Sequence, residues 1–357
     1  MSRLEIRNVG VIGAGTMGSG IAQLLAQSGL NVRLYDLSEE ILTRARGTIL
    51  SGLQKTGKAE ALDRVHQTTR LEELSDCDLA IEAAIENLSI KQDLFRRLGQ
   101  ILEPPKILAT NTSSLSVESI VAPVKHVERT LGLHFFNPAP LMRLVEIVRA
   151  AKTSEETLKL GSDFSRRLGK TPVSCKDTPG FIVNRVARPF YLAGMRLLER
   201  GAGEPADIDA AVRTQGGFRM GPLELMDLIG LDVNLSISQV IYEALGRPER
   251  LKPRDVQTQL VARRCLGRKS ARGFYLYEKI PSMTINPVLR EVLPGLSSKP
   301  LKPEQIFSEI LDGVVSEARR VAAEGVASEE DIDTAMCLGL NWPKGPLSWD
   351  KKLSPQS

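Results

Sequence analysis

The stretch LHFFNPAPLMRLVEIV, residues 133–148, places two chemically active side chains, His134 and Glu146, in a mostly apolar run. Burying either polar group without a partner costs free energy, so each needs a hydrogen-bond partner or a wet cavity. An imidazole, with an unperturbed pKa of about 6.5, can accept a proton near neutral pH. A carboxylate on its far nitrogen fixes the tautomer and stabilises the imidazolium. If the two side chains meet, they form an acid–base pair.

A purely structural explanation of these two residues stays open. His134 can be a core histidine bonded to a carbonyl, and Glu146 can pair with Arg143 or Arg149 across a strand. Structural ion pairs perturb pKa values as catalytic pairs do. The neighbouring aromatic residues, Phe135 and Phe136, are expected in the core. The residues alone therefore do not decide between catalysis and structure.

A second group of residues with a chemical pattern lies near the N-terminus, where Gly13, Gly15 and Gly18 follow an apolar strand at 9–12. In this spacing the first glycine makes a tight turn, and the second lets the backbone approach a pyrophosphate. The third lets the following helix, expected at 17–28, pack closely on the strand. The N-terminus of that helix faces the phosphates.

An acidic residue, Asp36, follows the next expected strand at 32–35. Its carboxylate can accept hydrogen bonds from the ribose hydroxyls and would repel a 2′-phosphate. Leu37 supplies no arginine to accommodate one, so NAD is favoured over NADP. Strand, glycine triplet, helix, strand and acid in this order form a much more specific signal than a glycine triplet alone.

Strands and helices alternate further along the chain. We expect strands at 78–84, 106–112, 130–136 and 144–148 and a helix at 88–100, which predicts a Rossmann-type, doubly wound, mostly parallel sheet. Ligands bind at the carboxyl ends of such strands. Three polar sets follow strand ends: Glu86, residues 111–114, and residues 134–137. His134 is therefore expected on the same rim as the cofactor.

Composition excludes several other classes of protein. The 357 residues carry 47 basic and 43 acidic side chains, a net charge of +4, which indicates no general nucleic-acid role but suits a phosphate-bearing ligand. The four cysteines are scattered, so neither a disulfide framework nor a metal site is indicated. No apolar run reaches about 18 residues, so no membrane span is expected. The first strand begins within ten residues, which leaves no room for a targeting peptide. We expect a cytoplasmic protein.

The C-terminal half changes to amphipathic helices, expected at 180–200, 205–215, 222–244 and 253–264. It also contains a repeat: ERGAGEPADIDAAVRTQGGFRMGPLEL (199–225) aligns without gaps on AEGVASEEDIDTAMCLGLNWPKGPLSW (323–349), at an offset of 124. At this offset Asn184 corresponds to Ser308. The predicted domains are a NAD-binding domain (1–178), an all-α domain (179–278), a linker (279–299) and a truncated second copy of the all-α domain (300–357).

These residues resemble the L-3-hydroxyacyl-CoA dehydrogenase (3-hydroxybutyryl-CoA dehydrogenase) family. The motifs GAGTMGSGIA, EAAIENLSIKQDLF, ATNTSSL, GLHFFNPAPLMRLVEIV, DTPGFIVNR and GRKSARGFY occur in the family's order between about residues 6 and 277. The resemblance implies that His134 is the base, Glu146 its partner, and Ser113 and Asn184 the residues that hold and polarise the substrate. It implies that NAD contacts Gly13, Ala14, Gly15, Thr16, Met17, Gly18, Asp36, Glu86, Lys91, Ser113, Asn137 and Lys269.

At the CoA end the sequence departs from the family pattern. The family holds CoA partly through a serine and a lysine after the second strand, but Gly52 stands at the expected serine position. Lys55 and Lys58 are the candidates for the CoA phosphates, and solvated surface lysines are the alternative explanation.

The resemblance implies NAD-dependent oxidation of (3S)-3-hydroxyacyl-CoA to 3-oxoacyl-CoA, in fatty-acid β-oxidation or aromatic-acid metabolism, by a homodimer formed through the helical domain. The alternative is a dehydrogenase of a free hydroxy acid such as L-gulonate, the lambda-crystallin-like branch. A non-enzymatic NAD-binding protein is disfavoured by the intact candidate residues. The second helical copy either imitates a dimer partner or is only a stabilising cover.

Overall fold

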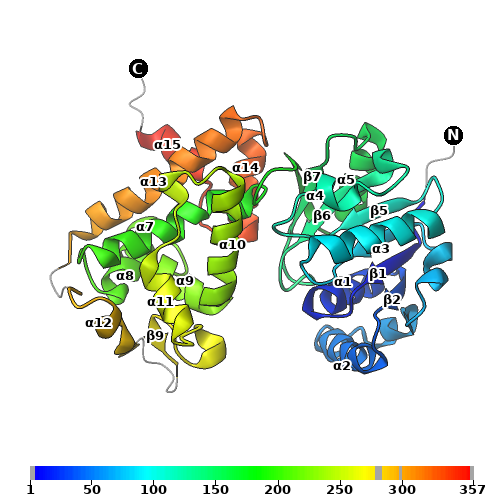
Figure 1. Ribbon diagram of the computed structural model, residues 1–357, viewed down its shortest axis with the longest axis horizontal. Helices are drawn as coiled ribbons and strands as arrows, with labels where there is room; N and C mark the ends of the chain where they lie inside the picture. The colour runs from blue at the N-terminus through cyan, green and yellow to red at the C-terminus, as the bar shows by residue number, and fades with distance from the viewer. Residues whose placement is uncertain (1–4, 278–283, 297–299, 354–357) are drawn as a thin grey trace. The chain divides into compact units, whose positions relative to one another are not determined.

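The computed structural model describes residues 5–277, 284–296 and 300–353. The chain divides into two compact units, Met1–Phe181 and Ile182–Ser357 (Figure 1). The predicted linker, 279–299, lies partly outside the described residues. Its described part contains a short strand, Thr284–Ile285 (β10), and a short helix, Val288–Val292 (α12).

An eight-stranded sheet in the order β3-β2-β1-β4-β5-β6-β7-β8 forms the centre of the first unit. The pairings from β3 to β6 are parallel, β7 runs antiparallel to β6, and β8 is parallel to β7. This architecture confirms the predicted Rossmann-type, mostly parallel sheet. The strands are Asn8–Ile12 (β1), Asn31–Tyr35 (β2), Val65–Thr68 (β3), Leu79–Glu82 (β4), Ile107–Thr110 (β5), Thr130–Phe135 (β6), Leu144–Arg149 (β7) and Thr171–Lys176 (β8).

The sequence analysis missed the two strands at the edges of this sheet, β3 and β8. Their sequences, VHQT and TPVSCK, are short or polar and lack a continuous apolar run. An edge strand has a neighbouring strand on one side only, so it is less enclosed and can carry polar residues. The helices of this unit are Thr16–Gln27 (α1), Glu39–Lys55 (α2), Leu88–Ile101 (α3), Val117–Val121 (α4) and Glu155–Arg167 (α5).

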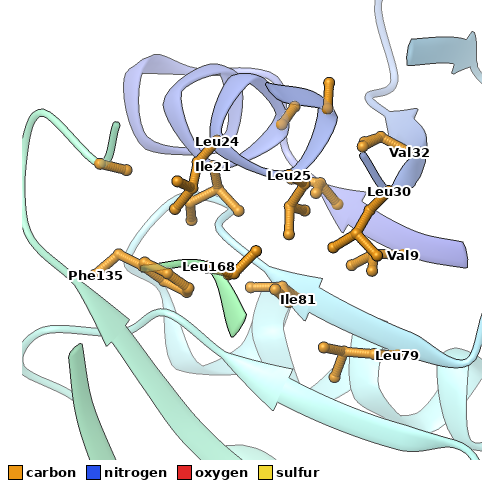
Figure 2. Close-up of a cluster of buried hydrophobic side chains, with 14 of the residues drawn as sticks. Val9, Ile21, Leu24, Leu25, Leu30, Val32, Leu79, Ile81, Phe135 and Leu168 are labelled. Carbon is orange, nitrogen blue, oxygen red and sulfur yellow. The ribbon is translucent and has the colours of Figure 1, made fainter. Parts of the chain in front are cut away.

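One face of the sheet packs against α1, α2 and α5. Figure 2 shows Ile21, Leu24 and Leu25 of α1 close to Val9 and Ile81 of the sheet, and all five are buried. Alternate strand residues belong to this core: Leu131, Leu133 and Phe135 of β6, and Val145 and Ile147 of β7.

Because side chains alternate along a strand, the intervening residues point to the opposite face. His134 and Glu146 are two of these, and so are Glu82 at the end of β4 and Thr110 at the end of β5. These four polar side chains therefore share one face of the sheet.

The second unit is helical, and two predicted helices are each broken in two. The expected helix at 222–244 is interrupted at Gly230, whose φ is 103°, and its two parts are bent by 102°. The expected helix at 180–200 divides next to Ala187, just before Pro189, which cannot donate a helical hydrogen bond. The remaining elements are Val183–Val186 (α6), Arg188–Glu199 (α7), Pro205–Gly216 (α8), Pro222–Ile229 (α9), Leu231–Ala244 (α10), Asp255–Ala262 (α11), Tyr275–Leu276 (β9), Pro303–Ala323 (α13), Glu329–Gly339 (α14) and Pro346–Leu353 (α15).

No single helix of the described chain is long and apolar enough to cross a membrane. The bent pair α9 and α10 passes the same length and composition test when the two are taken together.

The repeat in the sequence folds into the same local structure twice. Asp209 of α8 accepts hydrogen bonds from the backbone N–H groups of Leu223 and Glu224, at 2.9 and 3.0 Å. Asp333 of α14, 124 residues later, accepts the equivalent bonds from residues 347 and 348, at 2.8 and 2.9 Å. In both copies an aspartate thus caps the next helix at its N-terminus.

Equivalent residues of the two copies contact each other. The rings of Phe218 and Trp342, which are 124 residues apart, lie 5.4 Å from centroid to centroid. A Cβ on Gly313 of α13 would lie 3.3 Å from Pro189 of α7, and these two are also equivalent. Helices α7 and α13 therefore pack where the copies meet (Figure 1).

Two ion pairs between the copies are exchanged in the same way. Arg185 pairs with Glu324, at 2.6 Å, and Arg200 pairs with Glu309. Adding 124 to 185 gives 309, and subtracting 124 from 324 gives 200. Contacts that exchange in this manner are those of a two-fold symmetric interface, here within one chain.

Candidate active site

The glycine turn between β1 and α1 has one tightly enclosed end and one open side. The N–H of Gly13, whose φ is 100°, donates to the carbonyl of Tyr35 at 2.8 Å. A Cβ on Gly18 would lie 1.7 Å from the carbonyl oxygen of Gly13, so only glycine allows this packing. A Cβ on Gly15 would meet no atom within 4 Å. The space beside Gly15, at the N-terminus of α1, is open to a phosphate.

Asp36 lies at the end of β2, and its Oδ2 accepts a hydrogen bond from the N–H of Ala14 at 2.8 Å. Of the other predicted loop residues, Thr16 is exposed and Met17 half-buried. A mostly apolar cavity of about 530 Å³ adjoins them. The cavity, the acid and the open glycine together fit an adenine, its ribose and a pyrophosphate. The cavity is lined by residues 12, 13, 15, 35–37, 41, 83–85, 89, 90, 93, 94 and 97.

Lys91, a predicted cofactor contact, is almost fully buried. Its Nζ donates to Glu82 Oε1 at 2.6 Å and lies 3.2 Å from Glu86 Oε2. Glu82 also accepts a hydrogen bond from Thr110 Oγ1 at 2.7 Å, and its side chain is fully buried. The ammonium group of Lys91 therefore acts on this rim through the carboxylate of Glu86.

Glu86 joins the loop after β4 to the loop after β5. Its Oε1 accepts hydrogen bonds from Thr112 Oγ1 at 2.6 Å, from the N–H of Ser113 at 3.1 Å, and from Ser114. Burial opposes ionisation, but the charge of Lys91 and these donors outweigh it and hold the pKa of Glu86 below its usual value. Ser113 is thus fixed beside an ionised carboxylate.

His134 and Glu146 face each other across the antiparallel strands β6 and β7. They are register partners, and Nδ1 of His134 lies 2.6 Å from Oε2 of Glu146. His134 is 6% exposed and Glu146 is 0% exposed. The arginine that was an alternative partner, Arg149, pairs with Glu155 at 2.7 Å, and Arg143 is exposed. With Nδ1–H donating to the carboxylate, Nε2 is the basic nitrogen.

The His134 ring has aromatic neighbours. The centroids of the Phe136 and Phe181 rings lie 4.5 and 5.7 Å from its own, and Phe135 is buried in the core. The side-chain oxygen of Asn111 accepts a hydrogen bond from the N–H of Phe135 at 2.8 Å. Asn111 therefore anchors the strand at the residue next to His134.

The loop between β6 and β7, residues 136–143, carries the predicted NAD contact Asn137, which is exposed. A buried lysine holds this loop: Nζ of Lys170 donates to the carbonyls of Ala139 and Met142 at 2.7 Å and to that of Pro140 at 3.3 Å. Burial lowers the pKa of Lys170 to about 8.

Two predicted site residues belong to the helical unit. Asn184 is half-buried in α6. Lys269 is exposed, and its Nζ lies 2.6 Å from Oδ1 of Asp232. The equivalent of Asn184 in the second copy, Ser308, is exposed on α13.

The residues predicted to hold CoA lie in the last turn of α2 or, in the case of Lys58, just after it. A Cβ on Gly52 would lie 2.1 Å from the side-chain oxygen of Gln23, so a serine there would require Gln23 to move. Lys55 and Lys58 are both exposed, and Nζ of Lys58 donates to the carbonyl of Gln27 at 3.2 Å.

Three residues at or near the site were missed by the sequence analysis: Glu82, Lys170 and Arg185. Glu82 had a signal, because its position in the strand alternation predicts a buried acid that needs a cation. The partners of Lys170 and Arg185 lie about 30 and 132 residues away, at separations that local patterns do not reveal.

A glycine turn before a helix, an acid after the next strand and a histidine–carboxylate pair on the same sheet define the class of dinucleotide-dependent oxidoreductases. No group of His, Cys, Asp and Glu in the described part of the chain is arranged to hold a metal ion.

Comparison with known proteins identifies the family. The model of the 3-hydroxyacyl-CoA dehydrogenase NAD-binding domain matches residues 8–178, and the model of the C-terminal domain of the same enzymes matches residues 180–277 and 306–353. The chain belongs to the 3-hydroxyacyl-CoA dehydrogenase family; it is an NAD-dependent dehydrogenase.

Individual relatives cover most of the chain. A 3-hydroxyadipyl-CoA dehydrogenase of Escherichia coli is 37% identical and covers 99% of this chain and 92% of its own. A probable 3-hydroxybutyryl-CoA dehydrogenase of Deinococcus radiodurans is 43% identical, over 75% of this chain and 99% of its own. The crystal structure of a 3-hydroxybutyryl-CoA dehydrogenase from E. coli superposes with a TM-score of 0.91 at 36% identity, over 98% of this chain and 92% of that one.

Proposed function

We propose that the protein interconverts (3S)-3-hydroxyacyl-CoA and 3-oxoacyl-CoA, with His134 as the proton acceptor. The observation that supports this most directly is the buried hydrogen bond between His134 and Glu146. NAD, when bound, takes up the hydride from the carbon that carries the hydroxyl group. The protein must remove the hydroxyl proton and hold the reacting atoms.

In the oxidation direction, Nε2 of His134 accepts the proton of the substrate hydroxyl. Nδ1–H already donates to Glu146, so the carboxylate fixes the tautomer and stabilises the imidazolium that forms. In the reverse direction, the imidazolium returns the proton to the developing alkoxide. The apolar rings of Phe136 and Phe181 limit access of water to the imidazole.

The other predicted residues have binding roles in this proposal. The hydroxyl of Ser113 and the amide of Asn184 donate to the reacting oxygen or to the thioester carbonyl. Asp36 and the glycine turn hold the adenosine and the pyrophosphate, while Glu86, Asn137 and Lys269 contact NAD and Lys91 keeps Glu86 charged. Lys55 and Lys58 are exposed and available to the CoA phosphates.

The first experiment follows absorbance at the NADH band with purified protein and either acetoacetyl-CoA and NADH or (3S)-3-hydroxybutyryl-CoA and NAD. We expect turnover in the wild type and a loss of about 10²- to 10⁴-fold in His134→Gln. NADH binding, measured by fluorescence, should be unchanged in the variant. Activity that survives the substitution would make the pair structural.

A free hydroxy acid such as L-gulonate is the second candidate substrate. Gly52 supports it, because the serine expected to contact CoA is absent and Gln23 fills the space. The same assay separates the two substrate classes. Oxidation of free acids without turnover of any acyl-CoA would select the second candidate.

For the assembly, the exchanged contacts between the helical copies support the idea that the second copy takes the place of a dimer partner. A homodimer through the first helical copy would need the surface that α13 covers. Light scattering on the full chain and on a chain lacking 279–357 tests this. A dimer that is the same in both would contradict the imitation of a partner.

The pathway and the location remain part of this proposal. An enzyme of this specificity serves fatty-acid β-oxidation or the breakdown of aromatic acids through acyl-CoA intermediates, and we place it in the cytoplasm. Growth of a deletion strain on fatty acids or on aromatic acids distinguishes the two pathways.

A further inference from the structure

The short helix that carries Asn184 has few stabilising features within its own sequence. Helix α6 spans only Val183–Val186, and its N-cap residue, Ile182, provides no side-chain cap. Phe181, just before it, has a φ of 47°, which is unusual for a residue with a side chain. A single helical turn is not stable by itself, so tertiary contacts must set its orientation.

The first copy of the helical domain supplies one of these contacts. The guanidinium of Arg188 is buried, and its Nε donates to the backbone carbonyl of Asn184 at 2.8 Å. The same guanidinium donates to the carbonyl of Asn234 at 3.2 Å and to Ser238 Oγ at 3.1 Å. The carbonyl of Asn184 is thus tied to α10.

The second copy supplies the contacts on the next residue. Arg185 is 1% exposed, and its Nε donates to Glu317 at 2.9 Å. Its two terminal nitrogens donate to the two oxygens of Glu324, at 2.6 and 2.8 Å. Glu317, also 1% exposed, accepts further hydrogen bonds from Arg250, at 2.7 and 3.2 Å. Glu317 lies in α13, and Glu324 is the residue that follows its last turn.

This arrangement departs from the two-fold symmetry of the copies. The exchanged equivalent of the Arg185–Glu324 pair is Glu309–Arg200. The exchanged equivalent of the Arg185–Glu317 pair would be Glu309 with residue 193, which is an alanine. The buried carboxylate therefore occurs only on the side of the interface that carries Asn184, not on the side of Ser308.

Charge also favours a fixed geometry here. The hydrogen bond from Arg185 lowers the pKa of Glu324, so this carboxylate is ionised at neutral pH. A guanidinium that donates to both oxygens of one carboxylate and to a second carboxylate is restricted in direction as well as in distance.

We propose that Glu317 and Glu324 are positioning residues for Asn184: through Arg185, the second helical copy sets the orientation of the turn that presents Asn184 to the substrate. This inference rests on the proposed function of Asn184 as a substrate contact. The second copy, which has Ser308 in place of Asn184, then contributes to the reaction of the first copy. A displacement of about 1 Å at such a residue can lower the rate by roughly 10²-fold.

The test compares Glu324→Gln and Glu317→Gln with Glu309→Gln. All three remove a carboxylate in or directly after α13 that pairs with an arginine of the first copy, but Glu309 pairs with Arg200, at the other end of α7. In Glu324→Gln the buried guanidinium of Arg185 keeps its hydrogen bond to Glu317, so no buried charge is left unpaired and the chain should fold. Because Glu317 is 1% exposed, Glu317→Gln should disturb Arg185 more strongly and carries a greater risk of misfolding.

For Glu324→Gln we expect kcat with acyl-CoA to fall roughly tenfold and Kd for NADH to stay unchanged. Glu324→Asp should recover part of the loss. Glu309→Gln should shift Tm by a similar amount and leave kcat unchanged. Asn184→Ala should lower kcat at least as much as Glu324→Gln.

Equal kcat values in Glu324→Gln, Glu317→Gln and Glu309→Gln would overturn the proposal, and so would losses of kcat that follow Tm in all three. Failure of the proposed function looks different: the wild type itself would not turn over acyl-CoA. If Asn184→Ala were fully active while His134→Gln was inactive, the base would stand and the positioning role would fall.

Discussion

At the scale of single residues, the His134–Glu146 pair follows from the register of two antiparallel strands. Register partners on one face have Cβ atoms about 4.5–5.5 Å apart, so an imidazole and a carboxylate at those positions can bond directly. The residues alone left their partnership open, and the family resemblance implied it. The two side chains meet because β7 runs antiparallel to β6, a direction that a prediction of parallel strands does not include.

Glu146→Gln tests the partnership. The amide can donate to Nδ1 and favour the tautomer with the proton on Nε2, which cannot accept the substrate proton. We expect kcat to fall by about 10²- to 10⁴-fold, with NADH binding retained. The matched control is Glu155→Gln, which removes the exposed partner of Arg149 at the end of the same strand and should leave kcat unchanged. Equal activity of both variants would argue against an orienting role.

Alanine substitutions at Gly15 and Gly18 should distinguish an effect on NADH binding from an effect on stability. Gly15→Ala places its methyl group in open space, so stability should change little while Kd for NADH rises. Gly18→Ala places it 1.7 Å from the carbonyl oxygen of Gly13, so we expect a loss of stability as well. Thermal melts with and without NADH distinguish the two effects. A Gly15→Ala protein that binds NADH normally would show that no phosphate lies there.

Asp209 gives a prediction for pH. Burial raises its pKa to about 7, although Tyr275 and two backbone N–H groups donate to it. Between about pH 4 and pH 7 the folded state then binds a proton that the unfolded state has released. Stability therefore falls as pH rises, by up to about 1.4 kcal/mol per pH unit from this group. Urea unfolding of Asp209→Asn should lack this contribution, whereas Asp333→Asn, at the half-buried equivalent position, should keep it.

At the scale of elements, local patterns predicted the interior of the sheet better than its edges. The strands β1, β4, β5 and β6 are buried runs that a sequence window reveals, whereas β3 and β8 are edge strands with polar residues. The break at Gly230 was missed because both parts of the helix are amphipathic. Whether a helix continues through a glycine or bends there depends on tertiary packing, and a local window of sequence does not contain that information.

The loop at 136–143 shows how a distant residue controls an element. The ammonium group of Lys170 satisfies three carbonyls of this loop, and its own chain position lies before β8. Lys170→Met should leave these carbonyls without that donor, at a cost of about 1–3 kcal/mol. We expect faster amide hydrogen exchange in residues 136–143, measured by mass spectrometry, and weaker NADH binding through Asn137. Unchanged exchange would contradict the anchoring.

At the scale of the whole molecule, the helical unit contains two segments related by the internal repeat, and aromatic side chains join them. Trp342 is 6% exposed, and its ring lies 5.3 Å from that of Phe190 and 5.4 Å from that of Phe218. The repeat was visible in the sequence. The sequence did not show that the two repeated segments pack against each other, because an internal alignment identifies equivalent residues but not contacts.

Trp342→Ala should destabilise the helical unit by about 3–5 kcal/mol, the cost of removing a large buried ring. Urea unfolding followed by circular dichroism measures this. Trp349→Ala is the control near the chain's C-terminal end, where the ring is half-buried, and its effect should be smaller. If NADH binding by the first unit persists where the helical signal is lost, the two units unfold separately.

The hairpin that joins β6 to β7 also limits how descendants of this gene can change in length. A residue gained or lost between 136 and 143 would leave the register of the two strands unchanged, although it would displace the carbonyls that Lys170 holds. One gained at Phe135 or Val145, the rung next to the His134–Glu146 pair, would shift one strand by a position and send His134 or Glu146 to the opposite face. Over generations, insertions or deletions within the two strands should therefore be rarer than changes of length in the turn between them.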